Sequence, residues 1–172
     1  IASRIAGISL MGGGTFGNRR STGEFNIWVD PEAANVVLSP GFEHLTLLPL
    51  DATHQALFTR GNCAEFERLG TPAGVAAARF IGRRLDAEAR TTTATATPVH
   101  DVMCPAYLVR PEVITTRHLH VVVDTASPLT VGRTVMDLRP DTTVVPNAHV
   151  ALQADGAALL DLLMETFARE AT

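Results

Sequence analysis

The sequence predicts an α/β fold with a mostly parallel central sheet flanked by helices. Two patterns support this prediction. Short apolar segments alternate with helical segments from the first residues onward, which is typical of a parallel α/β sheet. Further short apolar segments then cluster before a final amphipathic helix. At 172 residues and 18.3 kDa, the chain is long enough for one domain of ordinary size.

The N-terminal part contains a strand, a glycine-rich loop and a helix. Residues 5–10 (IAGISL) predict a short buried strand, and residues 11–18 predict a loop rich in glycine. Asp30 can cap a helix, Pro31 suits the first helical position, and a second acid follows in the first turn. We therefore expect a helix over residues 33–38 that ends at the Ser-Pro-Gly sequence after it.

The middle of the chain continues the alternation. Residues 44–50 (HLTLLPL) predict a second strand, and Asp51 opens another helical segment. Residues 72–85 form a clear amphipathic helix. Three arginines are expected on its solvent side: Arg79, Arg83 and Arg84. Residues 91–97 (TTTATAT) are low in complexity, and we interpret them as a mobile connector rather than a strand.

The last part of the chain is richer in strands. A short helix is expected to start at Asp101, before the strands begin. Ser127-Pro128 marks a turn, and Asp155 is placed to cap the final helix. Three strands are expected here: residues 119–124, 130–137 and 148–154.

Composition excludes several classes of protein. A net charge of −4 and a pI near 5.8 argue against a nucleic-acid partner. With 46% hydrophobic residues and a mean hydropathy of +0.16, the chain is not disordered, yet no segment approaches the roughly 18 apolar residues of a membrane span. All 14 basic residues are arginine, which excludes lysine chemistry. Cys63 and Cys104 lack metal or disulfide spacing, so we expect two reduced thiols in a cytoplasmic protein.

The glycine-rich loop is the first candidate binding element. It directly follows a strand, and ligands in open α/β sheets bind at the carboxyl ends of strands. It lacks the G-x-G-x-x-G dinucleotide fingerprint, so a purely structural turn is the alternative. Glu24 and Asn26 would share one face of an extended segment and could bind neighbouring hydroxyls of a sugar. Alternatively, these side chains cap the backbone at the start of a helix.

A histidine and an aspartate form a second candidate. His100 could protonate a leaving group near neutral pH, and Asp101 could bind a hard metal ion. The alternative is an N-cap aspartate beside an exposed histidine. His118 and His120 alternate in a strand, but no third ligand is nearby, so we favour a solvated strand face over a metal pair.

Taken together, these motifs resemble a known family. The ordered series MGG, GN, EFN, DPEAA and PVHD, with Asn147 before the last strand, is similar to the C-terminal half of the inosine-uridine-preferring nucleoside hydrolase family. The resemblance covers residues 5–167. It implies the Rossmann-like fold of that family and hydrolysis of the N-glycosidic bond of a ribonucleoside to ribose and free base. In the family a Ca²⁺ ion holds the 2′ and 3′ hydroxyls of the ribose and the attacking water.

The resemblance also assigns roles to individual residues. His100 matches the general acid for the departing base in the non-specific and pyrimidine-preferring branches. Asp101 matches a calcium ligand, and Phe25 is expected to line the pocket. Four residues match positions that contact the ribose: Met11, Asn18, Glu24 and Asn26.

One part of the family pattern is absent from this chain. The Asp-x-Asp-Pro-Gly-x-Asp-Asp cluster, which in the family supplies most calcium ligands and the water-activating carboxylate, does not occur in the sequence. The chain begins Ile1-Ala2-Ser3, without an initiator Met. We therefore expect residues 1–172 to be the C-terminal part of a single nucleoside hydrolase domain, inactive alone and with its first strand at an exposed edge.

Two further expectations concern partners. The ligand should be a small ribonucleoside, and the resemblance suggests a homo-oligomer, either a dimer or a tetramer, or association with the N-terminal half. The alternative function is a non-catalytic module that binds a nucleoside or ribose, or mediates an interaction, and that derives from the hydrolase fold.

Overall fold

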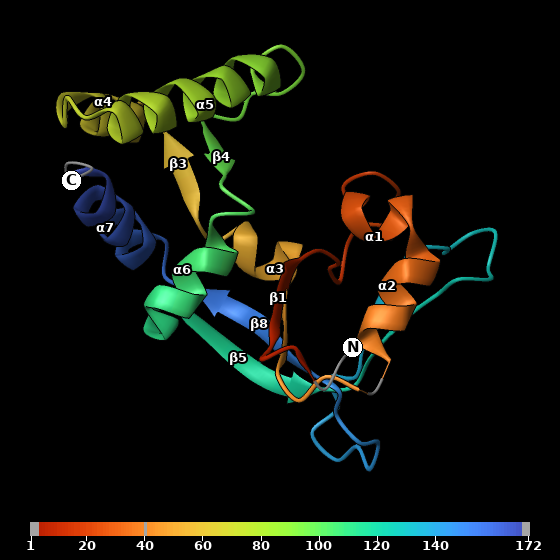
Figure 1. Cartoon of the computed structure of the whole chain (residues 1–172). Helices are drawn as coiled ribbons and strands as arrows, with labels where there is room; N and C mark the ends of the chain where they lie inside the picture. The colour runs from red at the N-terminus through yellow and green to blue at the C-terminus, as the bar shows by residue number, and fades with distance from the viewer. Residues whose placement is uncertain (1–3, 40, 170–172) are drawn as a thin grey trace.

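A four-stranded mixed sheet forms the centre of the computed structural model, which describes residues 4–39 and 41–169 (Figure 1). Its strands, in spatial order, are β1 (Ile8–Met11), β2 (Leu45–Leu48), β8 (Ala148–Ala154) and β5 (Ile114–Leu119). The β1–β2 and β2–β8 pairings are parallel, and the β8–β5 pairing is antiparallel. The predicted α/β class is confirmed, and β1 lies at one edge of this sheet as expected.

Helices cover both faces of the sheet. On one face, α1 (Phe25–Val29) and α2 (Pro31–Leu38) pack in the core that contains Leu47. On the other face, α6 (Met103–Val109) and α7 (Gly156–Phe167) pack in the core that contains Leu48 (Figure 1). Successive residues of a strand point to opposite faces, so β2 contributes to both cores and is buried along its whole length.

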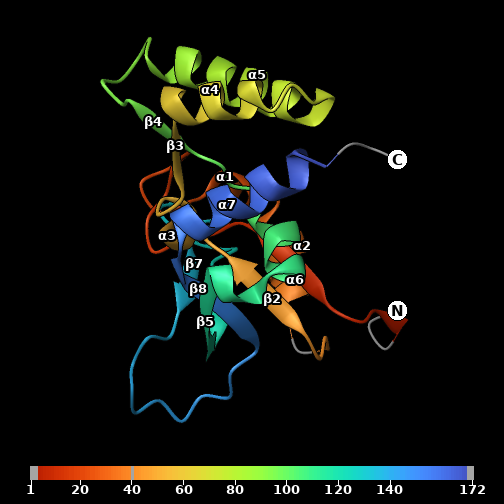
Figure 2. The same cartoon turned by 90° about the vertical axis from the view of Figure 1, so that its left-hand side faces the viewer.

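A helical hairpin stands away from the sheet. Figure 2 shows α4 (Arg60–Arg68) and α5 (Pro72–Glu88) above the rest of the chain, joined to it by β3 (Leu57–Thr59) and β4 (Ala96–Pro98). The expected amphipathic helix over residues 72–85 is α5. The β3–β4 pair is antiparallel, with Phe58 opposite Thr97.

The interpretation of residues 91–97 as a connector is wrong at its C-terminal end. Ala96 and Thr97 belong to β4, and the Thr97 side chain is fully buried. Its hydroxyl accepts from Arg84 and donates to Glu88, both on α5. Those partners favour a strand here, and the local sequence does not reveal them. The sequence prediction also missed β3 and α4.

The last strands are divided differently from the prediction. The expected strand over residues 119–124 is split at His120, because β5 ends at Leu119 and β6 (Val121–Val123) leaves the sheet to pair with β7 (Thr134–Met136). Asn147 stabilises the point where the chain leaves the sheet. Its side-chain oxygen accepts from the Val121 amide, and its side-chain nitrogen donates to the Val121 carbonyl. The short α3 helix (Leu50–Thr53) completes the elements that position the site.

The predicted caps are confirmed. The Asp30 side chain accepts from the Ala33 amide at the start of α2, and Asp155 accepts from the Ala157 and Ala158 amides at the start of α7. Cys63 and Cys104 are both free thiols. Within residues 4–39 and 41–169, no helix combines the length and the apolar character that crossing a membrane requires.

Candidate functional site

A cavity of about 540 Å³ lies beyond the carboxyl end of β1, between the glycine-rich loop and α5. We call its two sides the loop wall and the helix wall. The loop wall consists of Met11, Asn18, Glu24, Phe25 and Asn26. The helix wall consists of Phe80, Ile81, Arg84, Thr97, His100 and Asp101, with their neighbours Pro98, Val99 and Val102. The seven residues to which the family resemblance assigns a role, Met11, Asn18, Glu24, Phe25, Asn26, His100 and Asp101, therefore all line one cavity.

Glu24 organises the loop wall. Of the two alternatives that the sequence left open for it, the extended segment is wrong, because Glu24 is the N-cap of α1. Its Oε2 atom accepts from the amides of Gly13 (3.0 Å), Asn26 (3.0 Å) and Ile27 (3.2 Å). The side chain is 2% exposed. The capping alternative is thus confirmed, and the same buried carboxylate also reaches the cavity.

The glycine-rich loop wraps around this carboxylate. Gly13 has a φ of +72°, and a Cβ atom there would lie 2.4 Å from the Thr134 hydroxyl. A residue with a side chain would be strained and would clash. The Gly13 carbonyl accepts from the Leu50 amide at 2.9 Å, and Asp51 accepts from both the amide and the hydroxyl of Thr15. Helix α3 therefore holds the loop in place.

The remaining residues of the loop wall are fixed by one another. The Asn18 side-chain oxygen accepts from the Phe25 amide at 2.9 Å. The Asn26 side-chain nitrogen donates to the Met11 carbonyl at 3.2 Å and lies 3.3 Å from the Met11 sulfur. These bonds tie the start of α1 to the end of β1, so the polar side chains are held ready before any ligand arrives.

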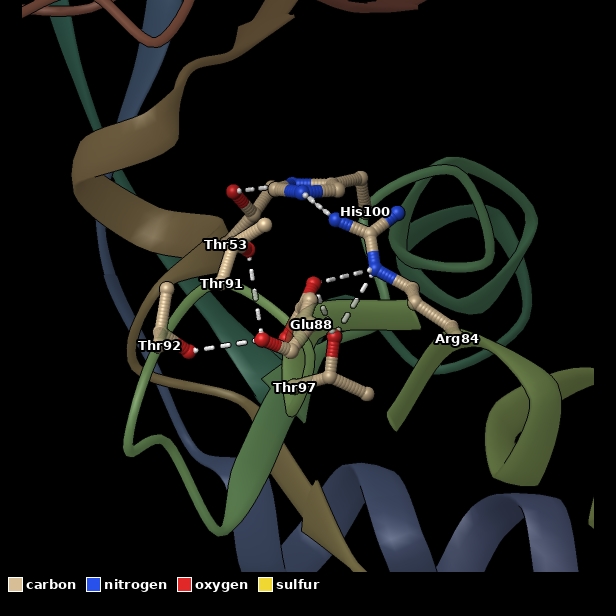
Figure 3. Close-up of polar contacts among 7 residues, drawn as sticks. All are labelled: Thr53, Arg84, Glu88, Thr91, Thr92, Thr97 and His100. Atoms are coloured by element: carbon tan, nitrogen blue, oxygen red, sulfur yellow. Dashed lines mark hydrogen bonds and ion pairs between the residues drawn. The ribbon is translucent and has the colours of Figure 1, made fainter. Parts of the chain in front are cut away.

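On the helix wall, His100 is bound at both ring nitrogens (Figure 3). Its Nδ1 atom lies 2.9 Å from the Thr53 hydroxyl, and its Nε2 atom lies 3.0 Å from Nη2 of Arg84. Arginine has no acceptor, so Nε2 accepts and the ring proton is on Nδ1. Burial, with the nearby Arg84 charge, lowers the pKa of His100 from 6.5 to about 4. His100 is therefore neutral near pH 7.

Arg84 is the functional candidate that sequence reasoning missed. Its side chain is 47% exposed, as the prediction for the solvent side of α5 requires, and it also lines the cavity. Its Nε atom donates to Glu88 at 3.0 Å and to Thr97 at 2.8 Å (Figure 3). The one available signal was the spacing of Arg84 and Glu88, four residues apart on one helix, which predicts an ion pair. Arg79 and Arg83 are exposed as predicted.

Comparison with known proteins identifies the family. The model of the inosine-uridine preferring nucleoside hydrolase family matches residues 1–161. The chain belongs to this family. A pyrimidine-specific ribonucleoside hydrolase RihB of Escherichia coli is 40% identical over 139 residues, which cover 80% of this chain and 44% of that protein. A putative enzyme of the same description from Shigella boydii is 40% identical and is covered over 57% of its length. The chain spans about half the length of these relatives.

Solved structures of nucleoside hydrolases show the same fold. The purine-preferring ribonucleoside hydrolase from Gardnerella vaginalis superposes with a TM-score of 0.80 at 30% identity, over 92% of this chain and 50% of that one. An inosine-guanosine nucleoside hydrolase gives a TM-score of 0.80 at 25% identity, over 97% of this chain and 53% of that one. The resemblance seen in the sequence motifs is therefore confirmed.

The described residues do not form a complete binding site for the Ca²⁺ ion that this family implies. Asp101 lines the cavity, and its side chain does not cap α6, so that alternative is not observed. Glu24 Oε2 and Asn18 Oδ1 already accept backbone amides. Within the described ranges, no three His, Cys, Asp or Glu residues are grouped to hold a metal. Calcium takes about six to eight oxygens, so these residues do not fit the ion by themselves.

The two walls offer different chemistry. The loop wall presents amide groups and a buried carboxylate, which suit a ligand with several hydroxyls. The helix wall presents a neutral imidazole, a guanidinium and the ring of Phe80, which is 76% exposed. A planar base with polar edges suits these groups.

Proposed function

We propose that residues 1–172 are the C-terminal part of a nucleoside hydrolase domain. In the complete protein, this domain hydrolyses the N-glycosidic bond of ribonucleosides to ribose and free base. The observation that carries this proposal is the convergence of the family's motif residues on the two walls of one cavity. Membership of the family supports it.

We assign the ribose to the loop wall. Asn18, Glu24 and Asn26 would hold its hydroxyls, with Met11 beside the sugar and Phe25 at the rim. Cleavage of the glycosidic bond builds positive charge on the ribose ring. A buried carboxylate that is already fixed by three backbone amides stabilises such a charge without reorganising. This arrangement therefore favours the transition state over the bound substrate.

We assign the base to the helix wall, next to His100. We assign the hydrogen bond or proton given to the departing base to the His100–Arg84 pair. The other polar side chains described on this wall are Asp101, a carboxylate, and Thr97, whose hydroxyl already donates to Glu88. Relatives of this chain include a pyrimidine-specific enzyme and a purine-preferring one, so the proposal covers both kinds of base.

Calcium belongs to this proposal only at the level of the complete protein. There, Asp101 would be the ligand that this chain contributes, and most ligands would come from the N-terminal part. The chain alone would then be inactive. We also propose a cytoplasmic protein that works as a homo-oligomer or in association with its N-terminal half.

Release of free base from uridine and inosine by the complete protein tests the assignment of the ribose. Asn26→Ala should lower kcat/KM by at least about 30-fold, because it removes a ribose contact and loosens the end of β1. Asn35→Ala is the matched control, since Asn35 is exposed on α2. Equal effects of the two substitutions would contradict the assignment. A complete protein that binds nucleosides in calorimetry but cleaves none would favour the non-catalytic binding module.

A further inference from the structure

We infer that Arg84 is the group that donates to the departing base, and that His100 is a positioning residue that aims Arg84. The inference rests on the proposed function. It names a catalytic residue for that reaction and changes the role that the family resemblance gives to His100.

The first step is the way Arg84 is held. One edge of its guanidinium is clamped, because Nε donates to Glu88 and to Thr97 and Nη2 donates to His100. Thr97 is fully buried and also donates to Glu88, which fixes the clamp itself. In the hydrogen bonds formed among the described residues, Nη1 has no partner. The side chain is 47% exposed and lines the cavity, so this free edge can reach a ligand.

The second step concerns His100, whose two nitrogens are both engaged. Nε2 uses its lone pair to accept from Arg84, and the proton on Nδ1 is given to the hydroxyl of Thr53. The Thr53 side chain is fully buried, and its own hydroxyl lies 3.5 Å from the Leu50 carbonyl. In this arrangement no N–H of the imidazole is free for the base. The imidazole instead offers an acceptor that orients the guanidinium.

The third step is the balance of the reaction. The bond between C1′ and the base nitrogen breaks, and its electron pair stays on the base. The oxygen of water bonds to C1′; water loses one proton to solvent, and the base gains one from solvent. Arginine stays protonated throughout, so Arg84 acts by hydrogen bonds from Nη1 and by its charge. Negative charge develops on the base only as the bond breaks, so this interaction is strongest in the transition state.

The test compares two substrates in the complete protein. Uridine has a poor leaving group, whereas 4-nitrophenyl β-D-ribofuranoside releases a nitrophenolate that departs without help. Arg84→Gln should lower kcat/KM for uridine by about 100-fold or more and that for the nitrophenyl riboside by less than about 5-fold. Arg83→Gln is the matched control on the exposed side of α5 and should change both by less than about 2-fold. The inference would be overturned if Arg84→Gln lowered kcat/KM for both substrates to the same extent, or for neither.

Variants of His100 separate positioning from acid catalysis. Gln cannot act as an acid, but its side-chain carbonyl can accept a hydrogen bond from Arg84. Ala can neither act as an acid nor accept a hydrogen bond. We expect His100→Gln to retain at least about 10-fold more uridine activity than His100→Ala. Equal loss in both variants would overturn the positioning role. A wild-type protein inert on both substrates would instead refute the proposed function, and this inference with it.

A measurement that does not need activity checks the hydrogen bonds directly. Nitrogen-15 NMR of the complete protein near neutral pH should show His100 with its proton on Nδ1. A proton on Nε2 would overturn the inference, because that nitrogen could not accept from Arg84.

Discussion

Glu24 gives the site a negative charge and also stabilises its backbone. One carboxylate oxygen accepts three backbone amides from the glycine-rich loop and the start of α1. Removing it leaves buried donors without an acceptor, which costs about 1–3 kcal/mol for each buried polar group, more when a charged partner is lost. The local structure on both sides of Glu24 therefore depends on this side chain.

We predict that Glu24→Ala lowers the free energy of unfolding by about 3 kcal/mol. Glu24→Gln keeps one acceptor oxygen and should lose about half as much. Denaturant unfolding of the chain measures both. Glu67→Ala, on the exposed side of α4, is the control and should stay within about 0.5 kcal/mol of the wild type. A Glu24→Ala protein as stable as that control would show that the amides find other acceptors.

His100 makes stability depend on pH. Burial first, and Arg84 second, lower the pKa of His100 from 6.5 in the unfolded chain to about 4 in the folded chain. The unfolded chain therefore binds the proton at a higher pH than the folded chain does. The contribution of His100 to stability is fully present above pH 6.5 and is lost as the pH falls towards 4.

We predict that His100→Gln flattens the fall in stability of the chain between pH 6.5 and pH 4. Denaturant midpoints at several pH values give this slope, and subtracting the variant's slope from the wild type's removes the carboxylates that titrate in the same range. His44→Gln, on an exposed residue, is the control and should leave the slope close to that of the wild type. Parallel curves for His100→Gln and wild type would contradict the assignment of a neutral, half-buried imidazole.

At the scale of single elements, local chemistry was a good guide to where helices begin. The caps by Asp30 and Asp155 and the amphipathic pattern of α5 were all predicted, because each involves neighbours within one turn of helix. Contacts between distant residues were not. The capping of α1 by Glu24 is local and was among the alternatives, but its bond to the Gly13 amide, 11 residues earlier, has no signal in the local sequence. Thr97 looked like part of a connector because its partners Arg84 and Phe58 lie on other elements.

The cap of α7 gives a prediction at this scale. Asp155 accepts from the Ala157 and Ala158 amides, and α7 packs in the core on the α6 face of the sheet. We expect Asp155→Ala to lower the free energy of unfolding by about 1 kcal/mol. Asp161→Ala, at an exposed position within the same helix, should not destabilise the chain. Thermal or denaturant unfolding that ranks the two variants in the opposite order would contradict the capping role.

At the scale of the whole molecule, the cavity is assembled from elements far apart in the sequence. The loop wall follows β1, and the helix wall comes from α5, β4 and the residues before α6. The family motifs predicted the loop wall, His100 and Asp101, because they are local sequences. They gave no indication of Arg84, Phe80 or Thr97. Phe80 and Arg84 lie on α5, and Thr97 lies on β4. The paired strands β3 and β4 join the α4–α5 hairpin to the rest of the chain (Figure 2), so these residues reach the cavity through contacts between distant segments.

The supply of calcium ligands gives a prediction at this scale. The described residues group no three candidate ligands, so the chain alone should bind Ca²⁺ more weakly than about 1 mM in calorimetry. In the complete protein, Asp101→Asn should weaken Ca²⁺ binding by about 10-fold or more, and Asp161→Asn should leave it unchanged. Micromolar binding by the chain alone would contradict the proposed division of ligands.

The most direct test of the central claim is the release of ribose and free base from uridine and inosine. The complete protein, the chain alone and the complete protein with a calcium chelator are compared at equal concentration. We predict multiple turnovers by the complete protein with Ca²⁺, and no release above background in the other two samples. A complete protein that leaves both nucleosides intact in the presence of Ca²⁺ would contradict the claim that this cavity belongs to a nucleoside hydrolase.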